Sequence, residues 1–335
     1  MLKESLIDTY KRHIPPIIDK LGIYDRVINK NKYKHKLVTP MYHRVIRSDD
    51  EDPLKMGMCV REDSFENQLA YYSNNFTSIG LSSYVLNKNI HNKNESYITL
   101  TFDDGYKDNI LQVKPLLEKY NLNATFFICC SILTDNKEFW WDKLINAFAK
   151  CDETTLDLLP FQSVLQISEL VISDSNRRES CIKLLSALWL IPDVYLIDDI
   201  CNYVEETLID YKFTIDKLTE ADIKDLYDSG FEIGAHTLTH PNLKIISNQQ
   251  QNDELKRSKT MLEDITGNKI NGFAYPAGYQ TSDLENLVKN SGYRYAVSTI
   301  NGINHTLKPF SIERFGLPET NLADIKRCIS NYCKA

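Results

Sequence analysis

Two adjacent carboxylates, Asp103 and Asp104, stand at the end of a predicted strand in the segment ITLTFDDGYKDN. Ile98, Leu100 and Phe102 alternate with threonines, a period of two that is typical of a β-strand. Neighbouring carboxylates repel each other, and a bound metal ion is the commonest way to keep both ionised. Asp and Gly are also common turn formers. This segment alone therefore leaves two equal interpretations, a turn and a metal site.

Two histidines, His236 and His240, provide a second group of possible metal ligands. They follow a short predicted strand, residues 231–235, at a spacing of i, i+4. If a helical turn begins there, both imidazoles project to one face, as in many sites for divalent metals. The alternative is one helix-capping histidine and one surface histidine. Together with one Asp, the pair would leave open positions for water and substrate, which is typical of a catalytic metal.

These residues belong to a regular alternation of predicted strands and helices. About seven apolar runs of strand length alternate with amphipathic segments, which indicates βα units and a parallel sheet. The predicted strands are residues 37–45, 98–102, 124–130, 231–235, 270–275, 293–299 and 311–315. A barrel of βα units places its chemistry at the carboxyl ends of its strands. Asp103, Asp104, His236 and Pro276 all stand at such ends.

The predicted barrel, residues 37–335, follows an N-terminal helical extension, residues 1–36, and is interrupted by an insertion at about 137–215. The insertion is helix-rich without a strand-like run, so we expect a helical lid or dimerisation element. Its tryptophan pair, Trp140 and Trp141, would either stack on a sugar or attach the insertion to the core, and we favour the second role. The extension would be a helical clasp on the barrel or an amphipathic segment on a membrane surface. Its mixed charges favour the clasp.

Composition restricts the expected partners and location. The chain has 335 residues and a formal net charge of −7, which disfavours nucleic acid. The basic residues 30–36 are expected to be a solvated linker, with lipid headgroups as the alternative partner. No apolar run is long enough to span a bilayer, and no secretory signal is visible. Because the eight cysteines form no CxxC pair, we expect a cytoplasmic protein with reduced thiols.

Three segments carry a resemblance to a known family: TFDDG at residues 101–105, HTLTH at 236–240 and FAYPAG at 273–278. They are similar to the motifs of the polysaccharide deacetylase family, which is carbohydrate esterase family 4 and is also called the NodB homology domain. The resemblance covers roughly residues 37–315, apart from the insertion, and implies an α/β fold, a distorted (β/α)7–8 barrel. MYHRV at residues 41–45 further resembles a subgroup with a Tyr-His motif on an N-terminal strand.

The resemblance implies a role for each matching residue. A divalent metal, usually zinc in this family, with Co²⁺, Ni²⁺ or Fe²⁺ as alternatives, would be bound by Asp104, His236 and His240. Asp103 would be the general base that takes a proton from the attacking water, and Thr237 would orient the site. The backbone N–H near Ala277 would stabilise the oxyanion. Contacts with the substrate are expected from Tyr275, Pro276 and Tyr106.

The general acid is the first point at which the chain departs from the family's common pattern. Many members place this histidine in a C-terminal motif that the chain lacks. The MYHRV segment therefore makes His43 the expected acid, with His305 as the rival.

The arginine beside the base is the second departure. The family usually has an arginine before the proline of the third motif, and here Ala274 and Tyr275 take its place. Arg314, at the end of the last predicted strand, is expected to position the Asp103 carboxylate instead. Arg294 is the alternative, with a surface ion pair as its equally common role.

These observations predict a metal-dependent N-deacetylase, a hydrolase of non-peptide carbon–nitrogen bonds. It would release acetate from an N-acetylated sugar of a surface polysaccharide or its precursor. Polymer, lipid-linked sugar and nucleotide sugar are all compatible substrates, and the oligomeric state is left open. A cytoplasmic location at the inner membrane face, with the N-terminal segment touching the lipid, would suit a lipid-linked sugar.

Two other functional classes share part of this pattern. A non-haem Fe(II) oxygenase also uses two histidines and one carboxylate, and a catalytically silent glycan-binding relative would share the fold. Asp103 distinguishes the deacetylase from both of these classes. An oxygenase has no need of a base beside its ligands, and a silent relative has no need of the complete set.

Overall fold

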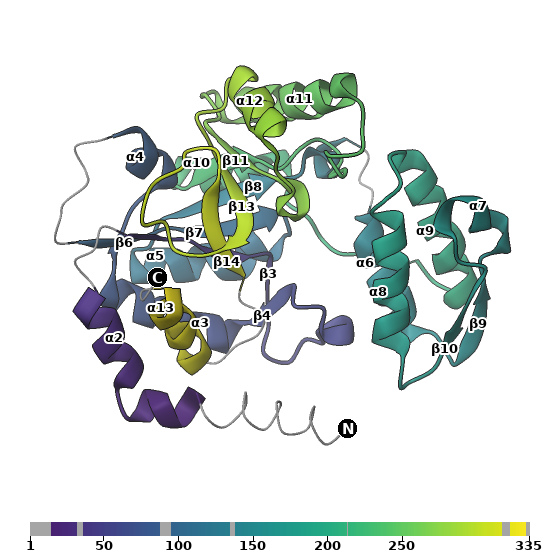
Figure 1. Cartoon of the computed structure of the whole chain (residues 1–335), viewed down its shortest axis with the longest axis horizontal. Helices are drawn as coiled ribbons and strands as arrows, with labels where there is room; N and C mark the ends of the chain where they lie inside the picture. The colour runs from purple at the N-terminus through teal and green to yellow at the C-terminus, as the bar shows by residue number, and fades with distance from the viewer. Residues whose placement is uncertain are drawn as a thin grey trace.

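A closed barrel forms the centre of the computed structural model, which describes residues 15–31, 36–87, 95–134, 138–212, 214–316 and 322–332. Within these ranges seven parallel strands pair in the order β11-β12-β13-β14-β2-β7-β8 (Figure 1). They are β2 (Pro40–Tyr42), β7 (Leu100–Asp104), β8 (Ala124–Ile128), β11 (Glu232–Ala235), β12 (Gly272–Ala274), β13 (Tyr295–Asn301) and β14 (Ile312–Gly316). The predicted βα barrel is confirmed, with seven strands.

Burial on both faces explains the apolar sequences of the barrel strands. All five residues of β8, ATFFI, are buried, as expected for a strand between the barrel interior and an outer layer of helices. All five residues of β7 are buried as well, although it ends in two aspartates. Its register with β8 pairs Asp103 with Phe127 and Asp104 with Ile128. The two carboxylates therefore stand at the carboxyl end of an otherwise apolar pair of strands.

Helices cover the outside of the barrel (Figure 1). They include α3 (Glu62–Asn75), α4 (Leu81–Leu86), α5 (Lys114–Tyr120), α10 (Glu220–Asp228), α11 (Asn248–Thr266) and α12 (Ser282–Asn290). Capping boxes begin two of them, Thr219 with Asp222 before α10 and Ser247 with Gln250 before α11. Each pairs a Ser or Thr with an Asp or Gln three residues later, a pattern that is visible in the sequence itself. Helix α11 also carries Glu254, a buried carboxylate.

The predicted strand at residues 37–45 is divided into three pieces, which is a correction. The first, β1 (Lys36–Val38), pairs in a parallel sheet with β6 (Ser96–Ile98), which also pairs with β5 (Thr77–Ser78). The second, β2, enters the barrel, and the third, β3 (Arg44–Ile46), pairs with β4 (Cys59–Arg61). The break between β2 and β3 falls at His43, so this side chain stands at a strand end.

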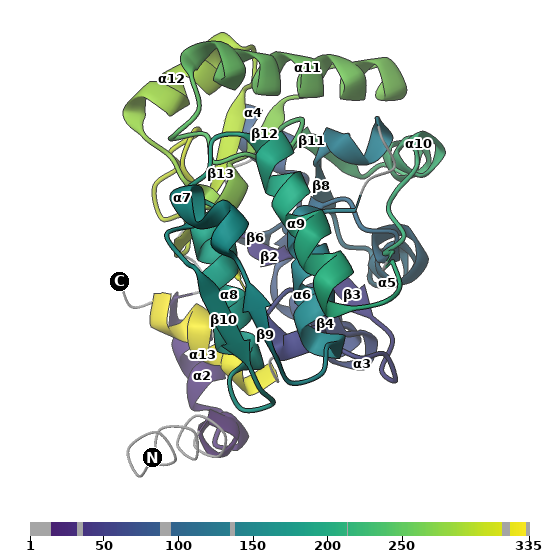
Figure 2. The ribbon, with the colours of Figure 1, turned by 90° about the vertical axis from the view of Figure 1, so that its right-hand side faces the viewer.

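The insertion forms a lobe beside the barrel, as the two views show (Figure 1, Figure 2). It contains the helices α6 (Trp140–Lys150), α7 (Gln162–Leu165), α8 (Arg177–Leu188) and α9 (Val194–Leu208) and the strands β9 (Thr154–Asp157) and β10 (Glu169–Ile172). The prediction of an insertion without strands is wrong, because β9 and β10 pair antiparallel. Four residues are too few for an alternating pattern to stand out in a sequence.

The two ends of the described chain pack together. Helix α2 (Ile23–Asn31) lies beside α13 (Leu322–Tyr332) (Figure 1). Lys326 on α13 forms ion pairs of 3.0 Å with both Asp19 and Asp25, and Tyr24 and Ile28 are buried in the main core. The described part of the N-terminal extension is therefore a clasp on the barrel domain.

The predicted membrane contact is assigned to residues 1–36, of which 1–14 and 32–35 lie outside the described residues. It stays a prediction. Within the described ranges, no helix is both long enough and apolar enough to cross a bilayer.

Candidate metal centre and active site

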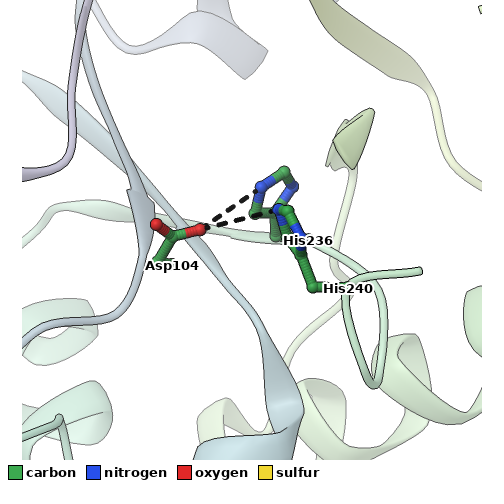
Figure 3. A group of neighbouring side chains, drawn as sticks. All are labelled: Asp104, His236 and His240. Carbon is green, nitrogen blue, oxygen red and sulfur yellow. Dashed lines mark ion pairs between the residues drawn. The ribbon is translucent and has the colours of Figure 1, made fainter. Parts of the chain in front are cut away.

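Three side chains from two strand ends converge at the carboxyl end of the barrel (Figure 3). Asp104 ends β7, and His236 and His240 follow β11. The Asp104 Oδ1 atom lies 3.5 Å from His236 Nε2 and 3.9 Å from His240 Nε2. One ligand atom from each of the three residues lies within 4.8 Å of the others. The structure thus brings the three predicted ligands together.

The local backbone, rather than a helical turn, brings the two histidines to one side. Residues 236–240 form an irregular loop, so the helical turn that was considered for them does not form. Thr237 and His240 have positive φ angles of 66° and 57°, and Asp104 has a φ of 77°. The Thr237 hydroxyl donates to the His236 carbonyl and accepts from the His240 N–H at 3.0 Å. Non-glycine residues with positive φ are often found at functional sites, where the surrounding structure supports them.

The chemistry of the three donors fits a divalent metal. Burial, the largest cause, lowers the pKa of both His236 and His240, so their imidazoles stay neutral and can act as ligands. Burial, together with the neighbouring Asp103 carboxylate, raises the pKa of Asp104 well above its ordinary value. A carboxylate in this position needs a nearby cation to ionise. Two neutral imidazoles and one carboxylate form a common three-ligand set for catalytic zinc.

Asp103 is held by an arginine on the other side. Arg314 in β14 donates from both terminal nitrogens to Asp103, at 2.7 Å to Oδ1 and 2.7 Å to Oδ2. Its Nε atom donates to the Ser298 carbonyl at 2.8 Å, and its side chain is fully buried. Burial raises the pKa of Asp103, but Arg314 and His236 outweigh burial and hold this pKa at about 2. Arg294, the alternative partner, is exposed.

Of the two candidate acids, His43 lies at the site and His305 does not. His43 is half-buried and lines the same cavity as Asp103 and the three ligands. Burial, the largest cause, lowers its pKa to about 4, although the Asp103 carboxylate raises it. His305 is exposed and is absent from the described lining of the cavity.

The cavity has a volume of about 270 Å³ and two different walls. The barrel wall, as we call it, consists of His43, Asp103, Asp104, His236, His240, Tyr275, Ala277 and Thr299. The insertion wall consists of Trp140, Trp141, Ile145, Leu185 and Trp189. Met56 and Met58, from the loop between β3 and β4, complete the lining.

The tryptophans of the insertion do more than the attachment that the sequence favoured. Trp141 is buried and stacks on Phe139, with 4.4 Å between ring centroids. Trp140 is half-buried, stacks on Trp189 at 6.1 Å and lines the cavity. The Asn242 side chain donates to the Trp189 carbonyl at 3.1 Å, which ties the insertion to the loop after His240. Trp140 and Trp141 therefore both pack against neighbouring rings and line the cavity.

Of the three expected substrate contacts, only one lines the cavity among the described residues. Tyr275 lines it, and so does Ala277, which has a φ of 49°. Pro276 is buried and not part of the lining. Tyr106 is fully buried, its hydroxyl donates to Asp142 at 3.1 Å, and it accepts from the Trp141 indole at 3.0 Å. The predicted substrate contact of Tyr106 is therefore wrong, because this side chain holds α6 against the barrel.

Two parts of the site were missed from the sequence. Trp189 and the methionines Met56 and Met58 reach the cavity from segments without a recognisable motif. The lone Trp at the end of a helical segment would have been the available signal. Glu254, on α11, contacts the loop between the histidines. Nothing in its local sequence distinguishes it from other helix glutamates.

Comparison with known proteins was made for sequence and for structure. The family model described as polysaccharide deacetylase matches residues 91–150 and 197–296. The unmatched stretch between them lies inside the insertion. The matched residues include the three candidate ligands and Asp103, whereas His43 and Arg314 lie outside them.

Two sequence relatives match short parts of the chain. Bacillus subtilis YxkH, whose name places it among the polysaccharide deacetylases, is 28% identical over 82 residues, which cover 24% of this chain and 29% of that protein. A peptidoglycan deacetylase of Helicobacter pylori is 31% identical over 74 residues, which cover 22% of this chain and 25% of that protein. The chain thus matches less than a third of the length of either relative.

Solved structures share the fold. The deacetylase PplD of Streptococcus pyogenes, solved with acetate, has a TM-score of 0.56 at 18% identity, covering 88% of this chain and 98% of that chain. A polysaccharide deacetylase of Bacillus cereus also has a TM-score of 0.56, at 20% identity, covering 88% of this chain and 69% of that one. These structures show the fold. The family model, whose matched segments carry Asp103 and the three candidate ligands at one barrel end, shows that the chain belongs to the polysaccharide deacetylase family.

Proposed function

We propose that the protein is a metal-dependent N-deacetylase that hydrolyses the acetamide of an N-acetylated sugar. One observation carries this proposal: a carboxylate held ionised by a buried arginine, Asp103 with Arg314, stands directly beside a three-ligand cluster. Hydrolysis of an amide needs an activated water, a polarised carbonyl and an acid for the departing amine. The barrel wall offers a candidate for each need.

Asp104, His236 and His240 would hold the metal. A divalent ion bound there would supply a Lewis acid for the carbonyl oxygen and would lower the pKa of water. The donor set suits zinc, and the identity of the ion is part of the proposal.

Asp103 would take the proton of the attacking water. Its low pKa keeps it ionised at neutral pH, and the two hydrogen bonds from Arg314 fix the plane of the carboxylate. Arg314 is itself fixed by Ser298 and by the Thr101 hydroxyl at 3.1 Å. The base is therefore oriented before the substrate binds, which reduces the reorganisation that the reaction requires.

His43 would deliver a proton to the departing amine. Because burial leaves this imidazole neutral in the resting site, the proton must reach it during the reaction, and the Asp103 carboxyl is the group from which it would come. The backbone N–H of Ala277, in a short turn at the cavity edge, is the candidate donor to the developing oxyanion.

The lining of the cavity favours an uncharged sugar unit over a nucleotide sugar. The diphosphate group of a nucleotide sugar is usually bound by cationic side chains. The described lining of the cavity contains neither Lys nor Arg. The flat apolar surfaces of Trp140 and Trp189 suit the apolar face of a sugar ring. A surface polysaccharide or its lipid-linked precursor thus remains the proposed substrate class. The proposed location, cytoplasmic and at the inner membrane face, is a separate expectation.

The non-haem iron oxygenase is the weaker alternative. Its ligand set would be the same three residues, but Asp103 and Arg314 would have no role in it. The family to which the chain belongs also argues for hydrolysis.

The test measures bound metal and released acetate together. The wild-type protein and Asp103→Asn are incubated with a panel of N-acetylated glycans, and products are identified by mass spectrometry. We expect metal in both proteins and acetate release about 10²–10⁴-fold slower in the variant. Asp225→Asn, an exposed site on α10, is the control and should behave as wild type.

Two outcomes would contradict the proposal. Unchanged acetate release in Asp103→Asn with metal retained would show that Asp103 is not the base. Metal binding without acetate release from any glycan of the panel would favour a silent glycan-binding relative.

A further inference from the structure

The two histidines of the candidate metal centre are oriented in different ways. The Nδ1 atom of His236 lies 2.8 Å from the Ala274 carbonyl, so the ring can donate there and present Nε2 to a metal. The Nδ1 atom of His240 is buried and has no hydrogen-bond partner on another residue in the described part of the chain. A metal-binding histidine usually receives its orientation from such a bond. The orientation of His240 must therefore come from elsewhere.

Rings on the insertion side supply part of the support for His240. Its ring centroid lies 4.6 Å from that of Trp141 and 5.6 Å from that of Trp189. Ring packing restricts the position of the imidazole but has little directional preference compared with a hydrogen bond. The direction in which His240 leaves the main chain is thus set by the loop that carries it.

A buried carboxylate on the neighbouring helix holds this loop. Glu254 on α11 is 8% exposed. Its Oε2 atom accepts from the N–H groups of Leu238 at 2.7 Å and Thr239 at 2.9 Å, and its Oε1 atom accepts from the Thr239 hydroxyl at 2.6 Å. These are charge-assisted hydrogen bonds, which are stronger than neutral ones. They hold Leu238 and Thr239 in place. The residues on either side, Thr237 and His240, both have positive φ angles.

The geometry points to Glu254 as a positioning residue for His240, acting through the backbone of the HTLTH loop. The inference rests on the metal site proposed above. Left-handed conformations are unfavourable at non-glycine residues and persist only where the surroundings enforce them. With Glu254 in place, one loop conformation presents His240 Nε2 to Asp104. Without it, the loop can relax and His240 leaves the ligand set.

The same helix offers a matched control. Glu263, also on α11, accepts from the Ile270 N–H at 3.1 Å and pairs with Lys259 at 3.1 Å. It too is a helix carboxylate that fixes a neighbouring loop, but that loop carries no candidate ligand. Loss of Glu263 should therefore affect stability without affecting metal affinity.

The test uses the full-length protein and Co²⁺ as the probe. We expect Glu254→Ala to bind Co²⁺ about 10–100-fold more weakly, the usual effect of removing a group that orients a ligand, with a changed visible absorption spectrum. Glu254→Gln can keep the backbone contacts through its carbonyl oxygen and should remain within about threefold of wild type. Thr239→Val removes one contact at nearly constant shape and should lie between the two. Glu263→Ala should bind as wild type.

Thermal unfolding of the metal-free proteins separates positioning from stability. A purely structural role of Glu254 would lower the melting temperature of the metal-free protein and leave the Co²⁺ affinity unchanged. That result would overturn the inference. If Glu254→Ala does not fold, Thr239→Val decides, and wild-type affinity in that variant overturns it equally. A wild-type protein that binds no Co²⁺ would instead overturn the metal site, and this inference with it.

Discussion

The two walls of the cavity are held in place by different forces. On the barrel wall, directional bonds fix the reactive groups: Asp103 by two contacts with Arg314 and His236 by the Ala274 carbonyl. On the insertion wall, packing of rings and aliphatic side chains predominates, as in the stacking of Trp140 on Trp189. Groups that exchange protons or hold a metal need a defined orientation, whereas groups that select a substrate need shape and apolar area. Under the proposed function, the barrel wall would therefore perform the reaction and the insertion wall would select the sugar.

The walls meet at His240. Trp141 and Trp189 contact this ring from the insertion, while its loop belongs to the barrel. The insertion is also bonded to the barrel through Tyr106, whose hydroxyl joins the Trp141 indole to Asp142. The insertion therefore packs against one candidate ligand as well as lining the cavity. Any substitution in it needs a measurement of bound metal beside that of activity.

The largest effect is expected from Asp104→Ala on the barrel wall. It removes the only carboxylate of the ligand set within the described residues, so metal content should fall to near zero and acetate release to background. Metal content by mass spectrometry and acetate release are the two measurements. Full activity of the metal-depleted variant would show that the barrel wall does not act through a bound metal, and would contradict the proposed division between the two walls.

The next effect is expected from Arg314→Met. Asp103 would stay buried without its partner, which destabilises the fold by about 3–5 kcal/mol, and acetate release should fall about 10²–10³-fold as the base loses its orientation. Bound metal should be unchanged. Denaturant unfolding and kcat are measured beside Arg294→Met, an exposed arginine that should resemble wild type. Equal effects of the two substitutions would remove Arg314 from the mechanism.

A third and smaller effect is expected from His43→Ala. Loss of the acid should slow acetate release about 10²-fold with metal retained. The comparison is His305→Ala, because His305 is exposed and outside the described lining. Greater loss in His305→Ala than in His43→Ala would reverse the assignment of the acid.

The smallest effect is expected from Trp140→Ala on the insertion wall. Trp140 lines the cavity but is not one of the two tryptophans in ring contact with His240. KM should therefore rise about 10-fold, equivalent to about 1.4 kcal/mol, while kcat and bound metal stay near wild type. Trp140→Phe should recover most of the affinity. A fall in kcat at constant KM would instead show that the insertion wall takes part in the reaction.

The sequence by itself determined the βα alternation, the Asp pair at a strand end, the paired histidines and the proline turn. Each of these lies in one short segment, where residue type and period act locally: apolar strand residues in β7 and β8, and the capping boxes of α10 and α11. Local forces of this kind are readable from a few neighbouring residues. The same information distinguished Arg314 from Arg294 only by its place at a strand end.

Tertiary structure alone decided how these segments meet. Asp103 and Arg314 are 211 positions apart, and their contact exists because β14 and β7 both flank β2 in the closed barrel. The left-handed residues of the HTLTH loop, the support from Glu254 and the entry of Trp189 into the cavity likewise depend on elements that are distant in the chain. Periodicity records which face of an element is apolar, but not which distant side chain it will meet. Barrel closure and the docking of the insertion supply that information.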